Sequence, residues 1–556
     1  MKQNNSLFRK KSVEQILKDA EASENGLSKI SLGIAAIVGA GIFSTIGLAS
    51  YNGGPAVSLL FVFTAIACVF TALSYAQFAS TVPVSGSAYT YAYVAFGEFF
   101  AWIIGWALIL EYAVSNMVVA ISWSQYFVSM LSGFGINIPK YLTLDPGSAI
   151  EAFDKLQSFG INALTKSEQY AALAYQSAPK IAGIPIILDL PAGIITALVT
   201  WLVYLGIKES RSASNFMVVL KIGVVLLVIC TGAFFVKPEN WTPFAPNGVK
   251  GVLSGVAAVF FAFIGFDSIS TTAEECVNPQ RDMPKAMIYC LIICTVLYVL
   301  ITLVLTGMVN YKELNVSDPL AFVFEYVGMD FMAGLISVSS VIAITSALLV
   351  YQLGQPRIWM TMSRDGLLWK RFSKIHPKYH TPSFATVVTG FVVAIPALFF
   401  KMDFFVDLTS VGTFFAFILV CGGVLYLDHS GLSKKSKFRV PYINGQYLIG
   451  ILLVLAIAAL LTYGKETILE WRLLSLVEII EHKLLTIVFW VTWFTLSILG
   501  YQYKFSFLPV AGILTNLYLM TELGSSNWLI FVIWLAIGLI IYFSYGYRKS
   551  KLAQGS

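Results

Sequence analysis

Long apolar stretches separated by short polar connections recur along nearly the whole chain. A helix that crosses a membrane needs about 20 consecutive, mainly apolar residues. The stretches of suitable length predict spans at residues 28–50, 56–80, 97–131, 186–206, 212–236, 251–274, 286–309, 330–355, 383–400, 405–427, 446–464, 484–503, 506–522 and 527–546. The third is longer than one crossing requires, so we expect it to be tilted or to extend beyond the bilayer. The pattern predicts an all-α integral membrane protein with about 14 transmembrane helices.

Two segments do not follow this pattern. Residues 132–185 form a long polar stretch, which we expect on the outer side of the membrane. Residues 466–481 combine the apolar spacing of a helix with many charges. That combination favours a helix lying at the membrane interface over a further span.

Composition and charge support a membrane protein. Hydrophobic residues make up 57% of the chain and charged residues 12%, whereas about a quarter of the residues of a soluble domain are charged. The net charge of +6 does not indicate nucleic-acid binding, because the basic residues follow membrane topology. With a cytoplasmic N-terminus, about 24 Lys and Arg fall in inner segments and about 11 in outer ones. We therefore expect a multi-pass protein of the cell membrane with both termini cytoplasmic.

Most of the inner basic residues lie in four clusters. These clusters are Arg9–Lys11, residues 357–378, residues 434–439 and residues 548–551. We interpret them as determinants of topology. The alternative is a site for anionic lipids.

Glycines interrupt two spans near the middle of the membrane. Gly39, Ala40 and Gly41 lie at the centre of the first span, and Gly265 lies next to Asp267 in the sixth. A helix in hydrocarbon must satisfy its own backbone hydrogen bonds. A break there presents backbone groups and half-helix dipoles to a polar ligand in a cavity lined by protein. Two such breaks, each in the first helix of a five-helix half, predict inverted repeats with a binding site at the midplane.

Three charged residues are predicted to lie deep in spans. Lys221 is about 16 Å from either end of its span, too far to reach the interface, so it serves transport or pins helix ends by binding carbonyl groups. Glu111 suits proton coupling, and its alternative role is a packing contact. Asp267 either caps the second half-helix or contacts the substrate.

Nothing in the pattern predicts catalysis or a cofactor. Cys290 and Cys294 are one helical turn apart, but they have no further metal-binding residues nearby. No span supplies a nucleophile with a base. We therefore expect neither an enzyme nor a metal site.

Several segments, in order along nearly the whole chain, resemble the amino acid–polyamine–organocation transporters, and within them the cationic amino acid transporter branch and its bacterial relatives. The segments that carry this resemblance are Gly33–Phe43, Pro83–Tyr89, Gly105–Tyr112, Phe260–Asp267, Thr272–Pro284, Met362–Leu368, Phe438–Pro441 and Trp534–Gly546. The chain departs from many bacterial relatives in the long outer segment 132–185 and in the extra spans near 446–503.

The resemblance implies a leucine-transporter-type fold, in which two inverted repeats of five helices each begin with a broken helix. The corresponding divisions are a cytoplasmic segment 1–27, a first repeat 28–236, a second repeat 251–427, a basic cytoplasmic loop 428–445, peripheral spans 446–546 and a cytoplasmic tail 547–556.

The resemblance also implies a substrate site at the two breaks. The substrate carboxylate would meet backbone N–H groups around Gly39, Ala40 and Gly41. Its ammonium would meet carbonyl groups near Ile37 in the first span and near Phe261, Ala262 and Ile264 in the sixth, beside Gly265. Phe261 resembles an aromatic lid. Lys221 matches a lysine that replaces a coupling sodium ion and bridges spans 1 and 8, and Glu111 matches a glutamate implicated in proton coupling.

The eighth span bears on the substrate side chain. Residues 339–349 contain no carboxylate for a cationic head group, although Ser340, Thr345 and Ser346 offer hydroxyl groups. We place the side-chain pocket at Ile344 and Thr345. The sequence thus predicts a proton-coupled, sodium-independent transporter of L-amino acids, with a neutral or broad substrate range favoured.

The alternatives are a transporter of arginine and lysine, an amino acid exchanger, and a receptor that does not transport. The expected partners are the amino acid, protons and the lipid bilayer, and the sequence specifies no accessory membrane subunit.

Overall fold

The fold is helical, as the apolar pattern predicts. The computed structural model describes residues 9, 41–81, 87–206, 211–267, 269, 279–316, 318–431, 433, 436, 438–463, 476–523 and 525–554. Within them, the one regular sheet is a short antiparallel hairpin, in which Lys180 pairs with Pro185 and Ile181 with Ile184. Its strands are β1 (Lys180–Ile181) and β2 (Ile184–Pro185).

Eight helical stretches of the described chain are long and apolar enough to cross a membrane. They contain α3 (Ile46–Gly53) with α4 (Val57–Thr81), α6 (Glu98–Gly133), α10 (Arg211–Gly232), α13 (Pro279–Met308), α15 (Asp330–Arg364), α17 (Met402–His429), α20 (Leu476–Tyr503) and α22 (Ser525–Ile541). Shorter apolar helices are α9 (Leu190–Tyr204), α11 (Gly248–Leu253) with α12 (Val256–Phe261), α16 (Ser383–Phe399), α18 (Leu448–Tyr463) and α21 (Phe507–Thr521). Each predicted span overlaps one of these helices, although the first is described only from Gly41 onward.

The remaining helices are short or lie in connections. They are the π-helical turn η1 (Gly41–Thr45), α5 (Ser87–Ala95), α7 (Pro146–Phe159), α8 (Lys166–Ser177), α14 (Pro319–Tyr326), the π-helical turn η10 (Tyr542–Gly546), α23 (Tyr547–Lys549) and α24 (Lys551–Gln554). Single turns of 3₁₀-helix are η2 (Gly54–Ala56), η3 (Lys140–Leu142), η4 (Ile161–Ala163), η5 (Ala233–Phe235), η6 (Pro238–Trp241) and η8 (Tyr311–Glu313).

The expected interfacial helix at 466–481 stays a prediction. Residues 464–475 lie outside the described chain, and residues 476–481 form the first turns of α20, which continues without interruption to Tyr503. Acidic residues such as Glu478 are favourable near the N-terminus of a helix, where they face its positive dipole end. The apolar stretch of α20 that is long enough to cross a membrane begins after these charges, at Lys483.

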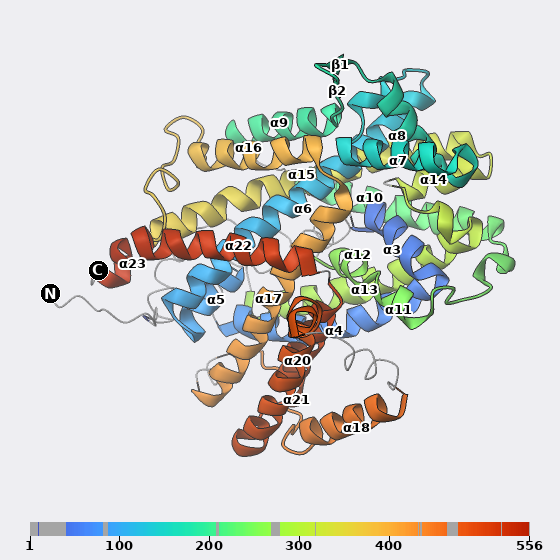
Figure 1. The fold of residues 1–556 in the computed structure, drawn as a ribbon. Coiled ribbons are helices and arrows are strands. Elements are labelled where there is room, and N and C mark those ends of the chain that lie inside the picture. Colours follow the sequence, from blue (N-terminus) through green and yellow to red (C-terminus); the bar gives the residue numbers. More distant parts are fainter. Residues whose placement is uncertain are drawn as a thin grey trace.

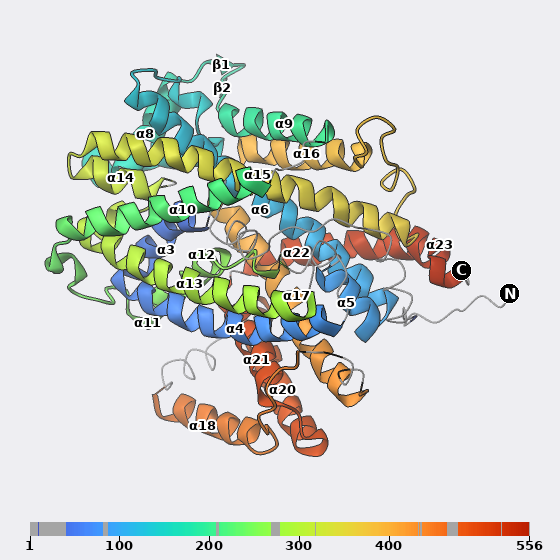
Figure 2. The same ribbon diagram turned by 180° about the vertical axis from the view of Figure 1, so that it is seen from behind.

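Three long helices cross at the centre of the molecule. Helix α6 packs against both α15 and α17, while α4 pairs with α13 and α9 pairs with α16. Figures 1 and 2 show α9 and α16 along one edge and α18, α20 and α21 as a group on the opposite edge. In the most apolar 18-residue stretch of α6, 89% is buried inside the molecule, whereas in that of α20 17% is buried. Helix α6 is thus the central scaffold, and α20 faces the surroundings of the bundle.

Indole groups fasten the last long helix to this scaffold. The Trp106 indole on α6 donates to the carbonyl of Trp534 on α22 at 2.7 Å, and the Trp534 indole donates back to the carbonyl of Trp106 at 2.9 Å. The Trp102 indole binds the carbonyl of Gly538 at 3.0 Å. Hydrogen bonds between helices hold well in hydrocarbon, where apolar burial alone gives helices little preference for one another over lipid.

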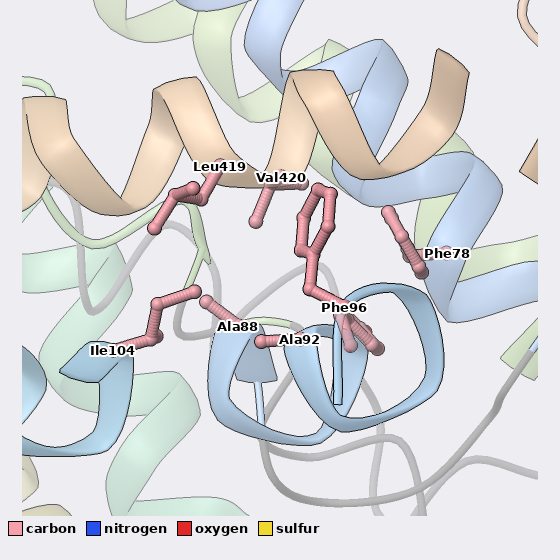
Figure 3. A pocket seen from close by; sticks show the side chains of 8 residues that line it. Phe78, Ala88, Ala92, Phe96, Ile104, Leu419 and Val420 are labelled. Carbon is pink, nitrogen blue, oxygen red and sulfur yellow. The ribbon is translucent and has the colours of Figure 1, made fainter. Parts of the chain in front are cut away.

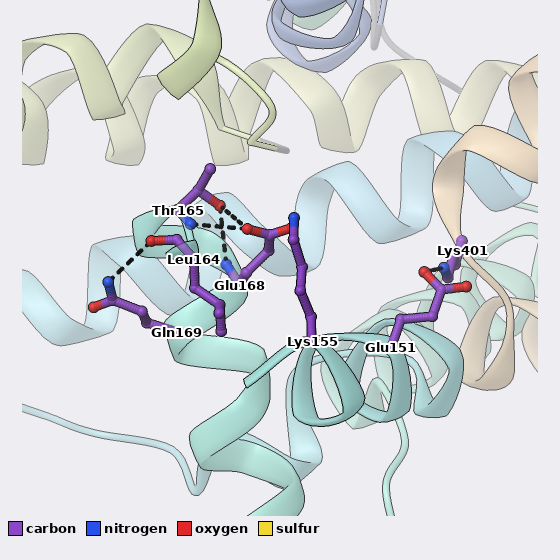
Figure 4. Close-up of polar contacts among 7 residues, drawn as sticks. All are labelled: Glu151, Lys155, Leu164, Thr165, Glu168, Gln169 and Lys401. Carbon is purple, nitrogen blue, oxygen red and sulfur yellow. Dashed lines mark hydrogen bonds and ion pairs between the residues drawn. The ribbon is translucent and has the colours of Figure 1, made fainter. Parts of the chain in front are cut away.

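The long polar segment between α6 and α9 folds into a small unit of its own. Helices α7 and α8 and the β-hairpin enclose a separate apolar cluster that includes Leu144, Leu164 and Ile187. Thr165 begins α8 with a capping box, because its hydroxyl accepts from the Glu168 backbone while the Glu168 carboxylate accepts from the Thr165 backbone (Figure 4). Residues 132–185 therefore contain a small folded unit with its own apolar cluster.

Charged side chains attach this outer unit to the bundle. Glu151 on α7 pairs with Lys401, which directly precedes α17 (Figure 4). The Lys166 ammonium lies 4.9 Å from the centre of the Tyr326 ring on α14. Each contact has an exposed or partly exposed component, so each contributes at most about 1 kcal/mol.

A buried ion pair joins the two ends of the chain. The Arg9 guanidinium lies 3.3 Å from the Glu98 carboxylate at the start of α6, and the two side chains are 3% and 1% exposed. Glu98 also accepts from the hydroxyls of Tyr93, Tyr542 and Ser550. The sequence analysis placed Arg9 in a basic cluster that determines topology and did not predict this buried partner. A lysine or arginine count reports the side of the membrane but not whether a particular side chain finds a buried partner.

We expect Arg9→Ala to destabilise the protein by about 3 kcal/mol, because removing one member of a buried ion pair leaves the other charge without its counter-ion. The apparent melting temperature of the purified protein measures the loss. Lys155→Ala is the matched control, because it breaks the exposed pair of Lys155 with Glu168 (43% and 31% exposed) and should cost at most about 1 kcal/mol. Equal shifts in the two variants would contradict this interpretation.

Candidate functional site

The described end of the first predicted break, at Gly41, touches the break in the sixth span, while the chain before Gly41 lies outside the described residues. Gly41 begins the π-helical turn η1, and helix α12 ends at Phe261, next to Ala262. A Cβ atom on Gly41 would overlap the Cα of Ala262 and lie 3.0 Å from its Cβ. The absent side chain is what lets the two backbones touch. Ile37, Gly39 and Ala40, predicted for the same site, lie outside the described residues.

Hydroxyl groups from neighbouring helices bind carbonyl groups at both breaks. Tyr126 on α6 donates to the carbonyl of Phe43, and Tyr298 on α13 donates to the carbonyl of Ala262 at 2.7 Å. The Thr45 hydroxyl bridges the carbonyls of Gly41 and Ala258 at 2.8 and 3.1 Å. Since a carbonyl oxygen has two lone pairs, these contacts hold the unwound backbone and leave Ala262 able to accept a second hydrogen bond.

The break in the sixth span turns at Gly265. This residue has a φ of 115°, a conformation that glycine adopts without strain. Its backbone N–H donates to the Asp267 carboxylate at 3.3 Å. This bond runs back toward α12, so the two predicted roles of Asp267, capping the second half-helix or contacting the substrate, stay predictions.

The phenylalanines around this break differ in their surroundings. Phe260 stacks on Phe414 of α17 with ring centres 3.7 Å apart, and Phe263 contacts Phe61 and Tyr298 edge-on. Phe261 is also buried, with an exposed fraction of 4%. Among the described residues, however, no other aromatic ring pairs with it in this way. Ile264 is similarly buried. Phe261 is therefore the aromatic side chain at the break that ring packing does not hold, as a lid requires.

Glu111 and Asp267 lie near each other in the core. Both are almost completely buried, and their carboxyl groups are close enough to interact electrostatically. The Glu111 side chain also hydrogen-bonds Thr413 on α17. Two acidic groups from α6 and from the sixth-span break are thus brought together, as the sequence alone did not predict.

Lys221 is completely buried on α10. Helix α10 packs against α13 and against α15, the eighth predicted span. The helix contact is compatible with the expected bridge from the fifth to the eighth span, and the bridge to the first span stays a prediction.

The hydroxyl groups near the predicted side-chain pocket on α15 differ in whether they already make hydrogen bonds. The Thr345 hydroxyl accepts from the Trp123 indole at 2.8 Å and donates to the Val341 carbonyl at 2.7 Å. Ile344 is completely buried. The Ser340 hydroxyl is buried, and no described residue hydrogen-bonds it. Ser340 is therefore a buried hydroxyl of the predicted site that makes no hydrogen bond to the described residues.

Hydrogen-bonded polar side chains connect three helices, which the sequence analysis did not predict. Asn116 on α6 donates to the Gln352 side chain on α15, which in turn donates to the Thr200 hydroxyl on α9 at 2.6 Å. Uncharged polar residues inside predicted spans were the available signal, because such groups need partners in hydrocarbon. The tyrosines at 126 and 298 carry the same signal in weaker form.

A small crevice between α5 and α17 is not part of this site. Its lining is entirely apolar or aromatic and includes Ala88, Phe96 and Leu419 (Figure 3). It has no room for a water molecule. An enclosed apolar space of this kind cannot hold a zwitterion.

The connection from α13 to α15 packs against α3 of the first predicted span. A Cβ atom on Gly47 of α3 would lie 2.6 Å from the carbonyl of Leu314 and 2.9 Å from that of Val316. Asp318 follows and accepts a hydrogen bond from Ser129 on α6. Burial raises the pKa of the Asp318 carboxyl to about 6, although the Ser129 bond acts in the opposite direction. A group that titrates near pH 6 therefore lies where this connection meets α6.

Known proteins match nearly the whole length of the chain. Residues 25–480 match the family model described as amino acid permease, and residues 506–550 match the model for the C-terminus of that family. The chain is 36% identical to the branched-chain amino acid permease BcaP of Bacillus subtilis, with 99% of each chain covered. It is also 36% identical to the methylthioribose transporter of Bacillus subtilis, covering 98% of this chain and 99% of the relative. Identity to the vacuolar cationic amino acid transporter 2 of Arabidopsis thaliana is 31%, covering 94% and 89%.

We expect Asp318→Asn to flatten the pH dependence of stability. The folded-state pKa of about 6 is raised above the usual value, so Asp318 contributes stability that is present below about pH 4 and is lost as the pH rises through 6. Asparagine keeps an oxygen for Ser129 but does not titrate. Apparent melting temperatures between pH 4 and 7 measure the difference. The variant should gain several degrees relative to wild type across this range, and parallel curves would show that Asp318 does not titrate as proposed.

Proposed function

The chain belongs to the amino acid permease family, and from that premise we propose that it moves L-amino acids by alternating access at the two helix breaks. The family makes it a transporter rather than an enzyme. The observation that carries the proposal is the direct contact of Gly41 with Ala262. This contact brings two interrupted helices to one point in the middle of the bundle.

The helix ends at this point suit a zwitterion. Helix α12 ends at Phe261 and has its partial negative charge there, which favours the ammonium group of a substrate. The described helical chain of the first span begins at Gly41 with the π-helical turn that leads into α3. If the predicted break lies directly before Gly41, the partial positive charge of this helix end favours a carboxylate there. Backbone groups thus bind the part that all amino acids share.

We propose a neutral, mainly apolar substrate side chain. Phe261, Ile264 and Ile344 are buried apolar groups of the predicted site, and Ser340 adds one hydroxyl. The relative BcaP is named for branched-chain amino acids. The alternative is a cationic side chain, for which a plant relative is named, and the carboxyl groups of Glu111 and Asp267 would then receive it.

We also propose coupling to protons without sodium. The buried carboxyl groups of Glu111 and Asp267 interact with each other, and such a pair is a natural carrier for a transported proton. Lys221 supplies a fixed or titratable cation in the core, where a sodium-coupled transporter would need a metal ion. Exchange of one amino acid for another remains the alternative mode.

Uptake into liposomes that contain the purified protein tests the substrate. We expect saturable uptake of leucine, isoleucine or valine above that of arginine and lysine, with methylthioribose included because of the relative named for it. Gly41→Val should reduce uptake at least tenfold, because the added side chain forces the two breaks apart. Gly334→Val is the control, since nothing lies within 4 Å of a Cβ atom at that position of α15. Bound amino acid without uptake or exchange would indicate a receptor.

Imposed gradients across the same liposomes test the coupling. An inward proton gradient should accelerate uptake, and replacing sodium with another cation should have no effect. Lys221→Met keeps most of the volume but removes the charge, so it should abolish the response to the proton gradient while substrate binding is retained. Dependence on sodium with no effect of pH, or full proton-driven uptake by the Lys221 variant, would refute this mechanism.

A further inference from the structure

A groove runs between α18 and α20, away from the proposed amino acid site. Its volume is about 420 Å³. The lining residues come from the turn before α18, from the first half of α18 and from the end of α20. They are Gln446, Tyr447, Gly450, Ile451, Val454, Leu455, Ser497 and Tyr501. Apolar side chains dominate its length, and the polar groups of Gln446, Tyr447 and Tyr501 gather at one end.

The groove opens to the surroundings of the bundle. Helix α18 packs against α20 and α21 and stands apart from the central helices α6 and α15 (Figures 1 and 2). Val454 is 66% exposed and Leu455 58%, and both are apolar residues of a predicted span. In a membrane these side chains meet hydrocarbon, so the groove is filled by something that comes from the bilayer.

The dimensions fit an acyl chain better than a protein helix. From Gly450 to Leu455 the groove follows α18 for about 8 Å, less than half of the 30 Å that a membrane-spanning partner helix would contact. Gly450 contributes no side chain, and nothing lies within 4 Å of a Cβ atom built there. This glycine leaves the middle of the groove open.

Aromatic residues line the polar end of the groove, and basic residues lie near this end in the sequence. The rings of Tyr447 and Tyr501 meet at nearly right angles with centres 5.8 Å apart, and tyrosines are typical of the level of lipid headgroups. Lys504 is exposed immediately after α20. Arg439, also exposed, lies in the connection that leads to α18. Acidic lipid headgroups are the membrane component whose charge complements these cations.

We propose that this groove binds one anionic phospholipid, with an acyl chain along Gly450 and Val454 and the headgroup beside Tyr501 and Lys504. The topology that the distribution of lysine and arginine predicts places the polar end of the groove in the cytoplasmic leaflet. A second copy of the chain is disfavoured as the occupant, because it would bring two basic groove ends together. The lipid would hold α18, which has few protein neighbours, against the rest of the molecule.

Native mass spectrometry tests the proposal on the full-length protein in detergent, titrated with phosphatidylglycerol or phosphatidylcholine. We expect one phosphatidylglycerol to bind to wild type with clear preference over phosphatidylcholine. Lys504→Gln should weaken this binding about fivefold, the factor that corresponds to about 1 kcal/mol per basic side chain near an anionic surface. The readout does not depend on transport, so its outcome is independent of the proposed amino acid specificity.

Gly450→Leu places a side chain in the open groove and should reduce phosphatidylglycerol binding at least tenfold. Leucine favours a helix more than glycine does, so the variant should fold, as its apparent melting temperature will show. Gly334→Leu on α15 is the control with similarly open space and should bind as wild type does.

Unchanged phosphatidylglycerol binding by Gly450→Leu would overturn the site. Equal retention of both lipids by wild type would overturn the anionic headgroup. A protein dimer that Gly450→Leu dissociates would make a second copy the occupant instead.

Discussion

The hydrogen-bonding demand of backbone groups in hydrocarbon controls this structure. Hydrocarbon offers no partner to an N–H or C=O group, so every interruption of a helix needs protein groups around it. Tyr126, Tyr298 and Thr45 supply such groups at the two breaks. The same demand explains why indole donors of Trp102 and Trp106 fasten α22 to α6. The proposed site depends on these contacts, because a polar ligand can bind only those backbone groups that the protein itself leaves without a hydrogen-bond partner.

Much of the architecture could be predicted from sequence because membranes penalise polar residues strongly. Apolar length located the spans, and the expense of burying charge made Lys221, Glu111 and Asp267 conspicuous. Glycine at mid-membrane indicated the two breaks, and Gly41 indeed touches the second one at Ala262. These features can be recognised from the sequence alone, because each such residue is unusual in an apolar membrane span.

The partners of these groups could not be predicted in the same way. Nothing in an apolar run distinguishes a tyrosine that binds a carbonyl, such as Tyr298, from one that only packs. The engagement of Thr345 by Trp123 depends on how α15 crosses α6, and so does the meeting of Asn116 with Gln352. The inner location of Arg9 was predicted from charge counting, but its burial against Glu98 depends on residues hundreds of positions away.

The pairing around Glu98 has a consequence for how the protein is made. Arg9 contacts the backbone of Tyr547, which lies 538 positions later, and Ser550 reaches Glu98 across 452 positions. A chain grows from its N-terminus at about 5–20 residues per second, so the surroundings of Arg9 exist only after Tyr547 and Ser550 have been made. The buried contacts of Arg9 therefore form after more than five hundred further residues have been added.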